Sequence, residues 1–498
     1  MSPGSWVLAA LVLSSLVPGA VIFLLAEDRQ RLRTGLNLAG AGAKIAFVFV
    51  LLRDVFQDRY PELRAPFLPG HDLVLRADAL AVFFVSLSAG LWFVTTVYAV
   101  GYLEGSPRRR RFFGYFSLCV TATVGVALAG NLLTFFLFYE LLTLSTYPLV
   151  VHRGTPAALR AGRVYLAYTL AGGAALLVGV VWLHAAAGPF DFQRNGALTG
   201  TGVEPAVLAA IFALLVLGAG VKAAVVPLHG WLPVAMVAPA PVSALLHAVA
   251  VVKAGAFGIT RIVYDVYGVA FASDLGLLGP LAALAAVTVV YGSVRALFQD
   301  DLKRRLAFST VSQVSYIALG VATVGPAVSL GGVVHLVHQG LMKITLFFGA
   351  GNLAETLGIH KVSEMDGVGR RMPWTMGAFT LAAFGMIGVP PLAGFVSKWY
   401  LAAGALEAGQ DWVILVLLAS SGLNAAYFLP VLHAAWFRPP RPELWKEEVP
   451  RGRLETGWML LAPTLVTALL SLLVGLAAHS PASPLAWVRI IAARELGP

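Results

Sequence analysis

Charged residues are scarce in this chain: they make up 12% of its 498 residues, while 58% are hydrophobic. A soluble domain usually carries about 25% charged residues. Too few polar side chains remain to cover the surface of a water-soluble globule, which excludes soluble enzymes, disordered chains and secreted disulfide scaffolds. The sequence therefore predicts an all-α, polytopic membrane protein.

Cysteine is almost absent. Cys119 is the single cysteine and lies in an apolar run. It cannot form an internal disulfide, so thiol redox chemistry and a cysteine-rich metal site are both excluded. The sequence also lacks a His-Glu-x-x-His motif and any pattern typical of NADH, flavin or iron–sulfur binding. We therefore expect no metal and no cofactor in this chain, and any redox chemistry would belong to another subunit.

Apolar runs of about 20 residues are long enough to cross the hydrocarbon core of a bilayer. We identify about fourteen such runs, at residues 6–26, 34–52, 79–103, 112–129, 131–151, 164–187, 206–228, 240–264, 275–298, 306–324, 327–354, 373–400, 411–437 and 457–478. The first run has no basic segment before it, since Met-Ser-Pro-Gly-Ser precedes Trp6. We interpret it as an uncleaved span rather than a signal peptide.

The chain has a net charge of +10, and its basic residues are concentrated in the loops between these runs. Loops after odd-numbered spans hold 21 of the 35 Lys and Arg residues: Arg29, Arg31, Arg33, Arg108 to Arg111, Arg153, Arg160, Arg163, Lys303, Arg304, Arg305, Lys361, Arg370, Arg371, Arg438, Arg441, Lys446, Arg451 and Arg453. The positive-inside rule then places these loops in the cytoplasm and both termini on the opposite face of a cell membrane, which for a bacterium is the inner membrane. The charge is mostly a topology signal, which removes nucleic acid as a partner.

Several ionisable residues lie inside the predicted spans. A charge at mid-bilayer costs at least about 2.5–3.5 kcal/mol, so such residues should face the bundle interior or a hydrated cavity. They are Glu140, Lys222, Lys253, Lys343 and Lys398, together with His247, His335 and His338. We expect Lys44, by contrast, to snorkel or to be loosely buried. Five intramembrane lysines would be costly in a purely structural scaffold, which makes that alternative less attractive.

The spacing of these residues favours proton transfer. His335, Gln339 and Lys343 are four residues apart and form one polar stripe on an otherwise apolar helix. His247 and Lys253 are six residues apart and lie on different faces of their helix. Histidine passes protons in either direction near neutral pH, and burial makes a lysine ready to release its proton. These residue types suit a proton relay better than redox chemistry.

Two predicted spans are interrupted by proline. Span seven ends in a segment with Lys222, Pro227 and Pro233, and span twelve contains Pro390 and Pro391 before Lys398. Proline breaks helices, and non-helical backbone at membrane depth survives only in protein or beside a water-filled cavity. This mirror placement predicts two inverted five-helix repeats, spans four to eight and nine to thirteen, with discontinuous helices seven and twelve. The expected units are 1–105 (spans one to three), 106–267 (first repeat), 268–440 (second repeat) and 441–498 (last span and short tail).

These segments resemble the proton-pumping antiporter-like membrane subunits. That family includes the antiporter-like subunits of respiratory complex I, the membrane arms of membrane-bound hydrogenases, and the A-type and D-type subunits of Mrp-type cation/proton antiporters. The resemblance covers most of the chain and is strongest from about 110 to 400. Its most specific stretch is Val221 to Ala254, supported by Asp300 to Gln313 and by the stripe from His335 to Lys343.

The resemblance implies a role for each of the intramembrane residues. Glu140 and Lys222 match the pair thought to open and close as an ion-pair switch. Lys253 matches the central lysine, with His247 on the connecting path. The polar residues of span eleven are matched by His335 and Lys343, and the residue facing the exit half-channel by Lys398.

One position departs from the family pattern. Many relatives have a histidine where this chain has Gln339. A glutamine cannot take up a proton near neutral pH, although it can order water. His338, one residue earlier, could substitute for the missing histidine.

The resemblance implies an ion-translocating subunit of a multi-subunit Na⁺/proton antiporter, working with other membrane subunits in the lipid bilayer. The amino-acid sequences of the segments Gly369 to Pro373 and Gly394 to Tyr400 are most similar to those of the D-type subunit. A proton-pumping subunit of a complex I-like NADH:quinone oxidoreductase or of a membrane-bound hydrogenase is the alternative, and a self-sufficient secondary transporter is a third possibility. An intramembrane hydrolase or a haem-binding carrier would need a nucleophile–base constellation or paired axial ligands, and neither is evident.

Overall fold

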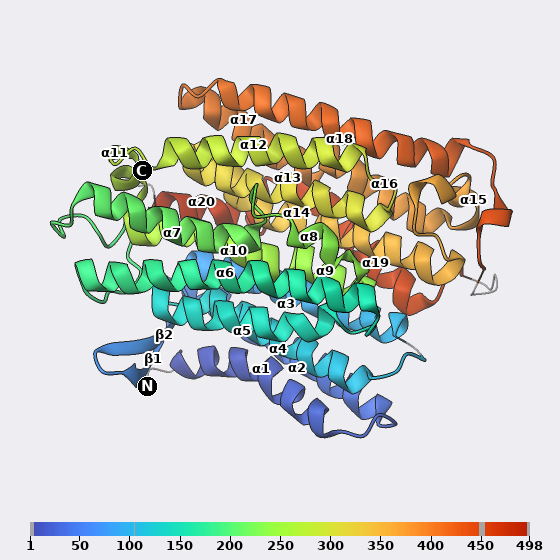
Figure 1. Cartoon of the computed structure of the whole chain (residues 1–498), viewed down its shortest axis with the longest axis horizontal. Helices are drawn as coiled ribbons and strands as arrows, with labels where there is room; N and C mark the ends of the chain where they lie inside the picture. Colours follow the sequence, from blue (N-terminus) through green and yellow to red (C-terminus); the bar gives the residue numbers. More distant parts are fainter. Residues whose placement is uncertain (1–3, 104, 448–453, 496–498) are drawn as a thin grey trace.

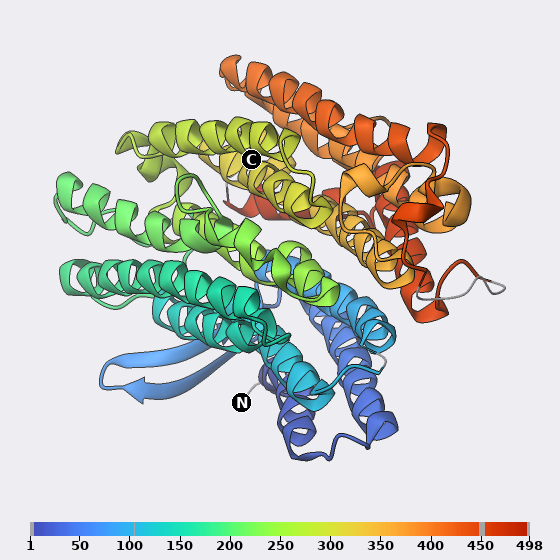
Figure 2. The same ribbon diagram turned by 45° about the vertical axis from the view of Figure 1, so that its right-hand side comes forward.

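The computed structural model of this chain describes residues 4–103, 105–447 and 454–495. These residues form a bundle of helices with one β-hairpin (Figure 1). The predicted loop residues Arg451 and Arg453 lie outside the described residues. In two views, the N-terminal helices and the helices near residue 420 form opposite edges of the bundle (Figures 1 and 2).

In chain order, the elements begin with two helices, a β-hairpin and a third helix. The N-terminal unit contains α1 (Ser5–Leu24), α2 (Gln30–Phe56), β1 (Glu62–Leu68), β2 (His71–Arg76) and α3 (Ala79–Tyr102). The next group contains α4 (Arg109–Leu128), α5 (Leu132–Val150), α6 (Pro156–Ala187), α7 (Pro205–Ala223), α8 (Trp231–Val234), η1 (Ala235–Val237), α9 (Ala240–Ala248), α10 (Val251–Arg261), η2 (Ile262–Tyr267) and α11 (Val269–Asp274).

The second half begins with α12 (Leu278–Leu297). It continues with α13 (Leu302–Ala322), α14 (Pro326–Leu357), η3 (Val362–Glu364), α15 (Val368–Arg371), α16 (Pro373–Ile387), α17 (Ala393–Glu407), α18 (Trp412–Phe437), η4 (Pro442–Leu444), α19 (Trp458–Leu476) and α20 (Pro484–Glu495).

The helices confirm the predicted number of membrane crossings. Among the described residues, 12 helical segments are long and apolar enough to span a membrane. Two further crossings are supplied by α13, which has 21 residues but is more polar, and by the broken pair α16–α17. With the 12 apolar segments they match the fourteen predicted spans. The chain is therefore a multi-pass helical membrane protein.

Both predicted proline breaks are present. The helix α7 ends at Ala223, and Ala224 adopts the left-handed conformation with φ 57° before the chain continues to α8. The helix α16 ends at Ile387, Gly388 has φ 98°, and α17 starts only at Ala393. Proline lacks the N–H that a continuing helix needs, so each break follows directly from the sequence.

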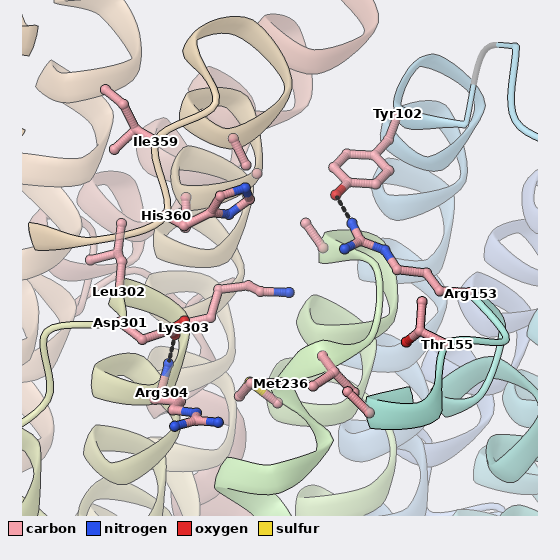
Figure 3. A pocket seen from close by; sticks show the side chains of 16 residues that line it. Tyr102, Arg153, Thr155, Met236, Asp301, Leu302, Lys303, Arg304, Ile359 and His360 are labelled. Atoms are coloured by element: carbon pink, nitrogen blue, oxygen red, sulfur yellow. Dashed lines mark hydrogen bonds between the residues drawn. The ribbon is translucent and has the colours of Figure 1, made fainter. Parts of the chain in front are cut away.

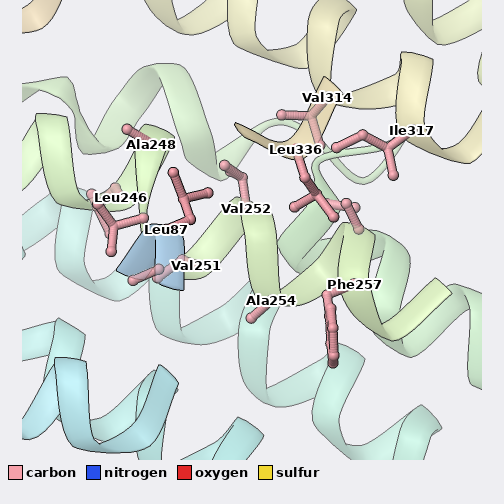
Figure 4. Close-up of a cluster of buried hydrophobic side chains, with 14 of the residues drawn as sticks. Leu87, Leu246, Ala248, Val251, Val252, Ala254, Phe257, Val314, Ile317 and Leu336 are labelled. Carbon is pink, nitrogen blue, oxygen red and sulfur yellow. The ribbon is translucent and has the colours of Figure 1, made fainter. Parts of the chain in front are cut away.

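A third break was not predicted. The helices α9 and α10 are separated at Val249 and Ala250, whose backbone leaves the helical conformation without any proline or glycine. Buried apolar side chains surround this break, among them Leu246, Val251 and Phe257 (Figure 4). The helices α9 and α10 pack against α14 and α13, and these tertiary contacts hold a backbone conformation that the local sequence does not favour.

The two ends of the bundle differ in character. The connections α3–α4, α5–α6, α12–α13 and α14–α15 converge at one end, the right end in Figure 1, and they carry most of the basic loop residues. The hairpin β1–β2 lies at the other end and was not predicted. It is antiparallel, and Val74 of β2 donates a backbone hydrogen bond to Thr134 of α5 at 2.8 Å.

Lys44 corrects one expectation. Its side chain is fully buried rather than snorkelling, and its Nζ donates to the carbonyl oxygen of Leu11 at 2.5 Å. Gly40 explains the burial, because a Cβ atom there would lie 2.4 Å from the carbonyl oxygen of Ser14. The absence of a side chain at Gly40 lets α2 approach α1 closely and encloses the lysine between them.

Candidate functional site

Glu140 of α5 and Lys222 of α7 form an ion pair beside the first helix break. The distance from Lys222 Nζ to Glu140 Oε1 is 3.6 Å, and the lysine side chain is 1% exposed. The same Nζ donates to the carbonyl oxygen of Tyr139 at 2.6 Å and lies 3.1 Å from the centre of its ring. The lysine is thus held by one carboxylate, one carbonyl and one aromatic face.

The backbone around this pair is fixed by its neighbours. The hydroxyl of Tyr139 donates to the carbonyl oxygen of Gly218 in α7 at 2.9 Å. Trp231 of α8 reaches back across the break, and its Nε1 donates to the carbonyl oxygen of Val221 at 2.7 Å. A carbonyl freed by the end of α7 is therefore satisfied by a side chain from beyond the break, as buried backbone requires.

Lys253 lies close to the same break because α10 packs tightly on the end of α7. A Cβ atom at Gly255 would lie 2.1 Å from the backbone nitrogen of Ala223, so only glycine permits this approach. Lys253 is fully buried, and no hydrogen-bond partner lies near its Nζ in the described part of the chain.

His247 occupies the other side of the α9–α10 break. Its ring is fully buried, and its centre lies 4.5 Å from that of Phe347 in α14. Neither ring nitrogen has a hydrogen-bond partner among the residues that the structure describes. His247 and Lys253 lie in separate helices, α9 and α10, rather than on one continuous helix, and both are polar groups in an apolar core.

The predicted stripe on α14 faces α13. His335 Nε2 lies 3.1 Å from Gln313 Oε1, and Lys343 Nζ donates to Ser309 Oγ at 2.6 Å. Gln339 lies between them and is buried without a partner among the described side chains. The stripe thus has one hydrogen-bonded residue at each end and an unpaired amide in the middle.

His338 points to a different helix from the stripe. Its Nδ1 lies 2.8 Å from Ser397 Oγ of α17, directly before Lys398 in the chain. If His338 takes the role of a histidine at position 339, its ring therefore acts from the side of α14 that faces α17. The geometry puts His338 beside the second break and not between His335 and Lys343.

Lys398 binds the end of α16 across the second break. Its Nζ donates to the carbonyl oxygens of Met386 at 3.2 Å and Ile387 at 2.7 Å, and to Ser421 Oγ at 2.8 Å. The side chain is 8% exposed. The two broken helices therefore differ: Lys222 pairs with a carboxylate, whereas Lys398 binds freed carbonyl groups and a hydroxyl.

A chain of hydrogen bonds joins Lys343 to Lys398. Ser309, which accepts from Lys343, is 2.7 Å from the hydroxyl of Tyr427. That hydroxyl donates to Asn424 Oδ1 at 2.7 Å, and Asn424 Nδ2 donates to the carbonyl oxygen of Met386 at 3.0 Å. Met386 also accepts from Lys398, so hydrogen bonds connect the two lysines. The shared carbonyl oxygen carries no proton, and within this network only the hydroxyls of Ser309 and Tyr427 can both accept and pass on a proton.

The sequence identified the ionisable members of this site and missed the neutral ones. Tyr139, Ser309, Asn424 and Tyr427 are single polar residues inside apolar helices, and only their contacts in the folded chain reveal them. Among the described residues, no group of three or more His, Cys, Asp or Glu side chains could hold a metal ion. The arrangement is suited to moving protons between fixed groups.

Comparisons with known proteins identify the family of the chain. Residues 129–424 match the family model described as NADH:quinone oxidoreductase/Mrp antiporter, transmembrane. The chain is similar to the N subunit of NADH-quinone oxidoreductase from Desulforudis audaxviator, with 37% identity over 418 residues that cover 82% of each chain. It is also similar to the D-type subunit of the Na⁺/H⁺ antiporter from Bacillus subtilis, with 28% identity over 475 residues that cover 93% of each chain.

A solved structure extends the similarity to nearly the whole fold. A chain in the structure of the Mrp complex from a Dietzia species superimposes with a TM-score of 0.88 at 25% identity. The match covers 99% of this chain and 98% of that one.

Proposed function

The chain belongs to the NADH:quinone oxidoreductase/Mrp antiporter transmembrane family, and on that basis we propose that it is the ion-translocating subunit of a multi-subunit Na⁺/proton antiporter. The observation that carries the proposal is the hydrogen-bonded path from Lys343 through Tyr427 to Lys398. The hydroxyls of Ser309 and Tyr427 carry exchangeable protons, and this polar connection inside the bundle ends at a broken helix, the kind of place where transporters form their ion sites.

In the proposed mechanism, Glu140 and Lys222 form the switch that controls the relay. Two unit charges about 4 Å apart attract each other by on the order of 4 kcal/mol in a partly polar protein environment. The carboxylate therefore favours the protonated lysine while the pair is closed at 3.6 Å. When the pair opens, this stabilisation is lost and the lysine releases its proton toward Lys253.

We propose that the proton then passes the centre of the bundle to reach α14. Lys253 and His247 are buried and lack partners among the described residues. Buried polar groups require hydrogen-bond partners, so water that reaches these groups would connect them to the α14 stripe. From Lys343 the hydroxyls of Ser309 and Tyr427 lead toward Lys398 and the exit side, and water would carry the proton past the carbonyl of Met386.

The proposed units place each functional break in its own repeat. Residues 106–267 contain the Glu140–Lys222 pair, and 268–440 contain Lys343 and Lys398. The inverted relation of the two repeats and the cytoplasmic position of the basic loops are part of the proposal. The proposal also includes neighbouring membrane subunits and a location in the cell membrane of a bacterium.

Full-length similarity to antiporter subunits supports the antiporter. The antiporter subunit of Bacillus subtilis is matched over 93% of both chains, and the Mrp complex chain over 98% or more. The higher identity to a quinone oxidoreductase subunit keeps a redox-driven proton pump as the second candidate. In that case the same relay would be driven by electron transfer in another subunit.

Mass spectrometry of the complex purified in a mild detergent tests the proposal. We expect small hydrophobic membrane subunits without redox proteins, and a pH change across vesicle membranes on addition of Na⁺. Co-purifying flavin, iron–sulfur or nickel subunits would contradict the antiporter and support the redox-driven pump.

A further inference from the structure

A cavity of about 350 Å³ opens at the basic end of the bundle, between the two groups of helices (Figure 3). One side is formed by Arg153 and by Met236 at the end of η1, and the other by Asp301 and Lys303 at the start of α13. Ala240, the first residue of α9, and Gly351 of α14 also contribute to its wall. The positive-inside rule makes this end the cytoplasmic one.

Lys303 lies across the boundary between the two groups of helices. Its side chain extends from α13 toward the opposite wall (Figure 3). Its Nζ donates to the carbonyl oxygen of Ala238 at 2.6 Å. Ala238 lies between η1 and α9 in an extended conformation, so this carbonyl has left the helical hydrogen-bond pattern.

Other charged groups act on Lys303, and of these Asp301 and Arg153 line the cavity. The carboxylates of Asp301 and Glu355 attract its ammonium group, and the guanidinium of Arg153 repels it. Arg153 also donates to the hydroxyl of Tyr102 at 3.5 Å (Figure 3). The lysine thus has carboxylates near it that can exchange protons, and it lines a cavity that water from the cytoplasm can enter.

The same two helices lead from the cavity to the relay. Ala240 begins α9, and His247 is seven residues further along it; Ala350 of α14 lines the cavity, and Lys343 is seven residues before it. At 1.5 Å per residue, each relay residue is about 10 Å below the cavity.

We propose that Lys303 is the group through which protons from the cytoplasm enter the relay. Its ammonium group gives one proton to His247 through water, forming an N–H bond on the imidazole and leaving a neutral amine. The amine then takes a proton from hydronium in the cavity, which becomes water. The bond to Ala238 holds the charged lysine at the boundary until transfer occurs. This inference rests on the proposed function.

The test uses Lys303→Cys in the complete complex, in inside-out vesicles that expose the cytoplasmic face. Two methanethiosulfonate reagents are compared: the aminoethyl reagent restores a titratable ammonium group, and the trimethylammonium reagent restores the charge without a proton. The native Cys119 is fully buried, and treated wild-type vesicles serve as the reference. The neighbouring exposed residue supplies the matched control, Arg304→Cys.

We expect Lys303→Cys to reduce proton transport at least tenfold, the aminoethyl reagent to restore most of it, and the trimethylammonium reagent to restore none. Arg304→Cys should transport normally before and after either reagent. Equal recovery with both reagents, or wild-type transport by untreated Lys303→Cys, overturns the proposal. The proposal is also overturned if the cysteine at position 303 does not react with the reagents from the cytoplasmic side.

A second variant covers a failure of Lys303→Cys to assemble. Lys303→Arg keeps the charge and a donor for Ala238 but does not release a proton, so we expect assembly with at least a tenfold loss of transport. Wild-type transport by this variant overturns the proposal. Lys222→Met separates the proposed entrance at Lys303 from the proposed relay. If Lys222→Met is inactive while Lys303→Arg is fully active, only the proposed entrance is wrong. If Lys222→Met is active, the proposed relay itself is wrong.

Discussion

Asn424 and Lys398 share one hydrogen-bond acceptor, the carbonyl oxygen of Met386. Asn424 Nδ2 lies 3.0 Å and Lys398 Nζ 3.2 Å from this oxygen. The carbonyl is free to accept both because α16 ends one residue later, at Ile387. A broken helix thus joins a polar residue of α18 to a lysine of α17, and the hydrogen-bonded path from Lys343 ends there.

Tyr427→Phe should interrupt that path without disturbing its packing. The substitution removes only the hydroxyl that contacts Ser309 and Asn424. Unpaired buried polar groups cost about 1–3 kcal/mol, and each 1.36 kcal/mol on a barrier is tenfold in rate. We expect proton transport by the complex in vesicles to fall about tenfold or more.

Tyr98→Phe is the matched control for this variant. The hydroxyl of Tyr98 is also buried and donates to a carbonyl, that of Phe348, but it lies off the path. Its loss should leave transport near the wild-type rate. Equal transport by the two variants would show that the Tyr427 hydroxyl carries no protons.

Gly255→Ala should push α10 away from the end of α7. Its Cβ atom would meet the backbone nitrogen of Ala223 at 2.1 Å, and backbone cannot move as easily as a side chain. Overpacking of this kind costs about 1–3 kcal/mol or more. We expect a lower Tm of the detergent-solubilised complex and slower proton transport. Gly90→Ala, where no atom lies within 4 Å, should change neither.

Gln339 should matter as a polar group and not as a proton carrier. It is buried between His335 and Lys343 and has no partner among the described side chains. We expect Gln339→Leu to slow transport by about tenfold, since an apolar side chain cannot order water there. Gln339→His should transport at least as fast as the wild type. Normal transport by the leucine variant would remove this position from the relay.

His152 should make the stability of the protein depend on pH. It follows α5 outside the membrane-spanning segment, and burial, with help from Arg111 and Arg108, lowers its pKa from 6.5 to about 4. Between these values the unfolded chain binds the proton and the folded one does not. Stability is therefore fully present above about pH 6.5 and is lost as the pH falls toward 4.

His152→Gln should flatten this dependence. We expect the difference in Tm between pH 6.5 and pH 4 to be smaller for the variant than for the wild-type complex. An identical pH dependence of the two proteins would show that this histidine does not titrate with folding.

The sequence predicted the parts of the fold that have strong local causes. Long apolar runs predicted the spans, and proline predicted the breaks before Ala393 and after Ala223. The break at Val249 and Ala250 escaped prediction because it contains neither proline nor glycine and depends on packing around it. The β-hairpin was missed because its residues were too polar for a span and too few for a pattern.

The same distinction holds at the candidate site. The intramembrane charges Glu140 and Lys222 were visible in the sequence because a charge in an apolar run is unusual, and the structure brings them within 3.6 Å. Ser309 and Tyr427 were not, because hydroxyl residues are common in membrane helices and acquire a role only through their neighbours. Lys44 shows the converse: a conspicuous lysine can be buried away from the path.

The most direct test of the relay compares Lys222→Met and Lys44→Met in the complete complex. Both substitutions remove a buried lysine, but only Lys222 pairs with Glu140. Proton movement on addition of Na⁺ is followed in inside-out vesicles with a pH-sensitive dye, at matched levels of assembled complex. We predict that Lys222→Met abolishes the signal while Lys44→Met retains it. Wild-type proton movement by an assembled Lys222→Met complex would contradict the account.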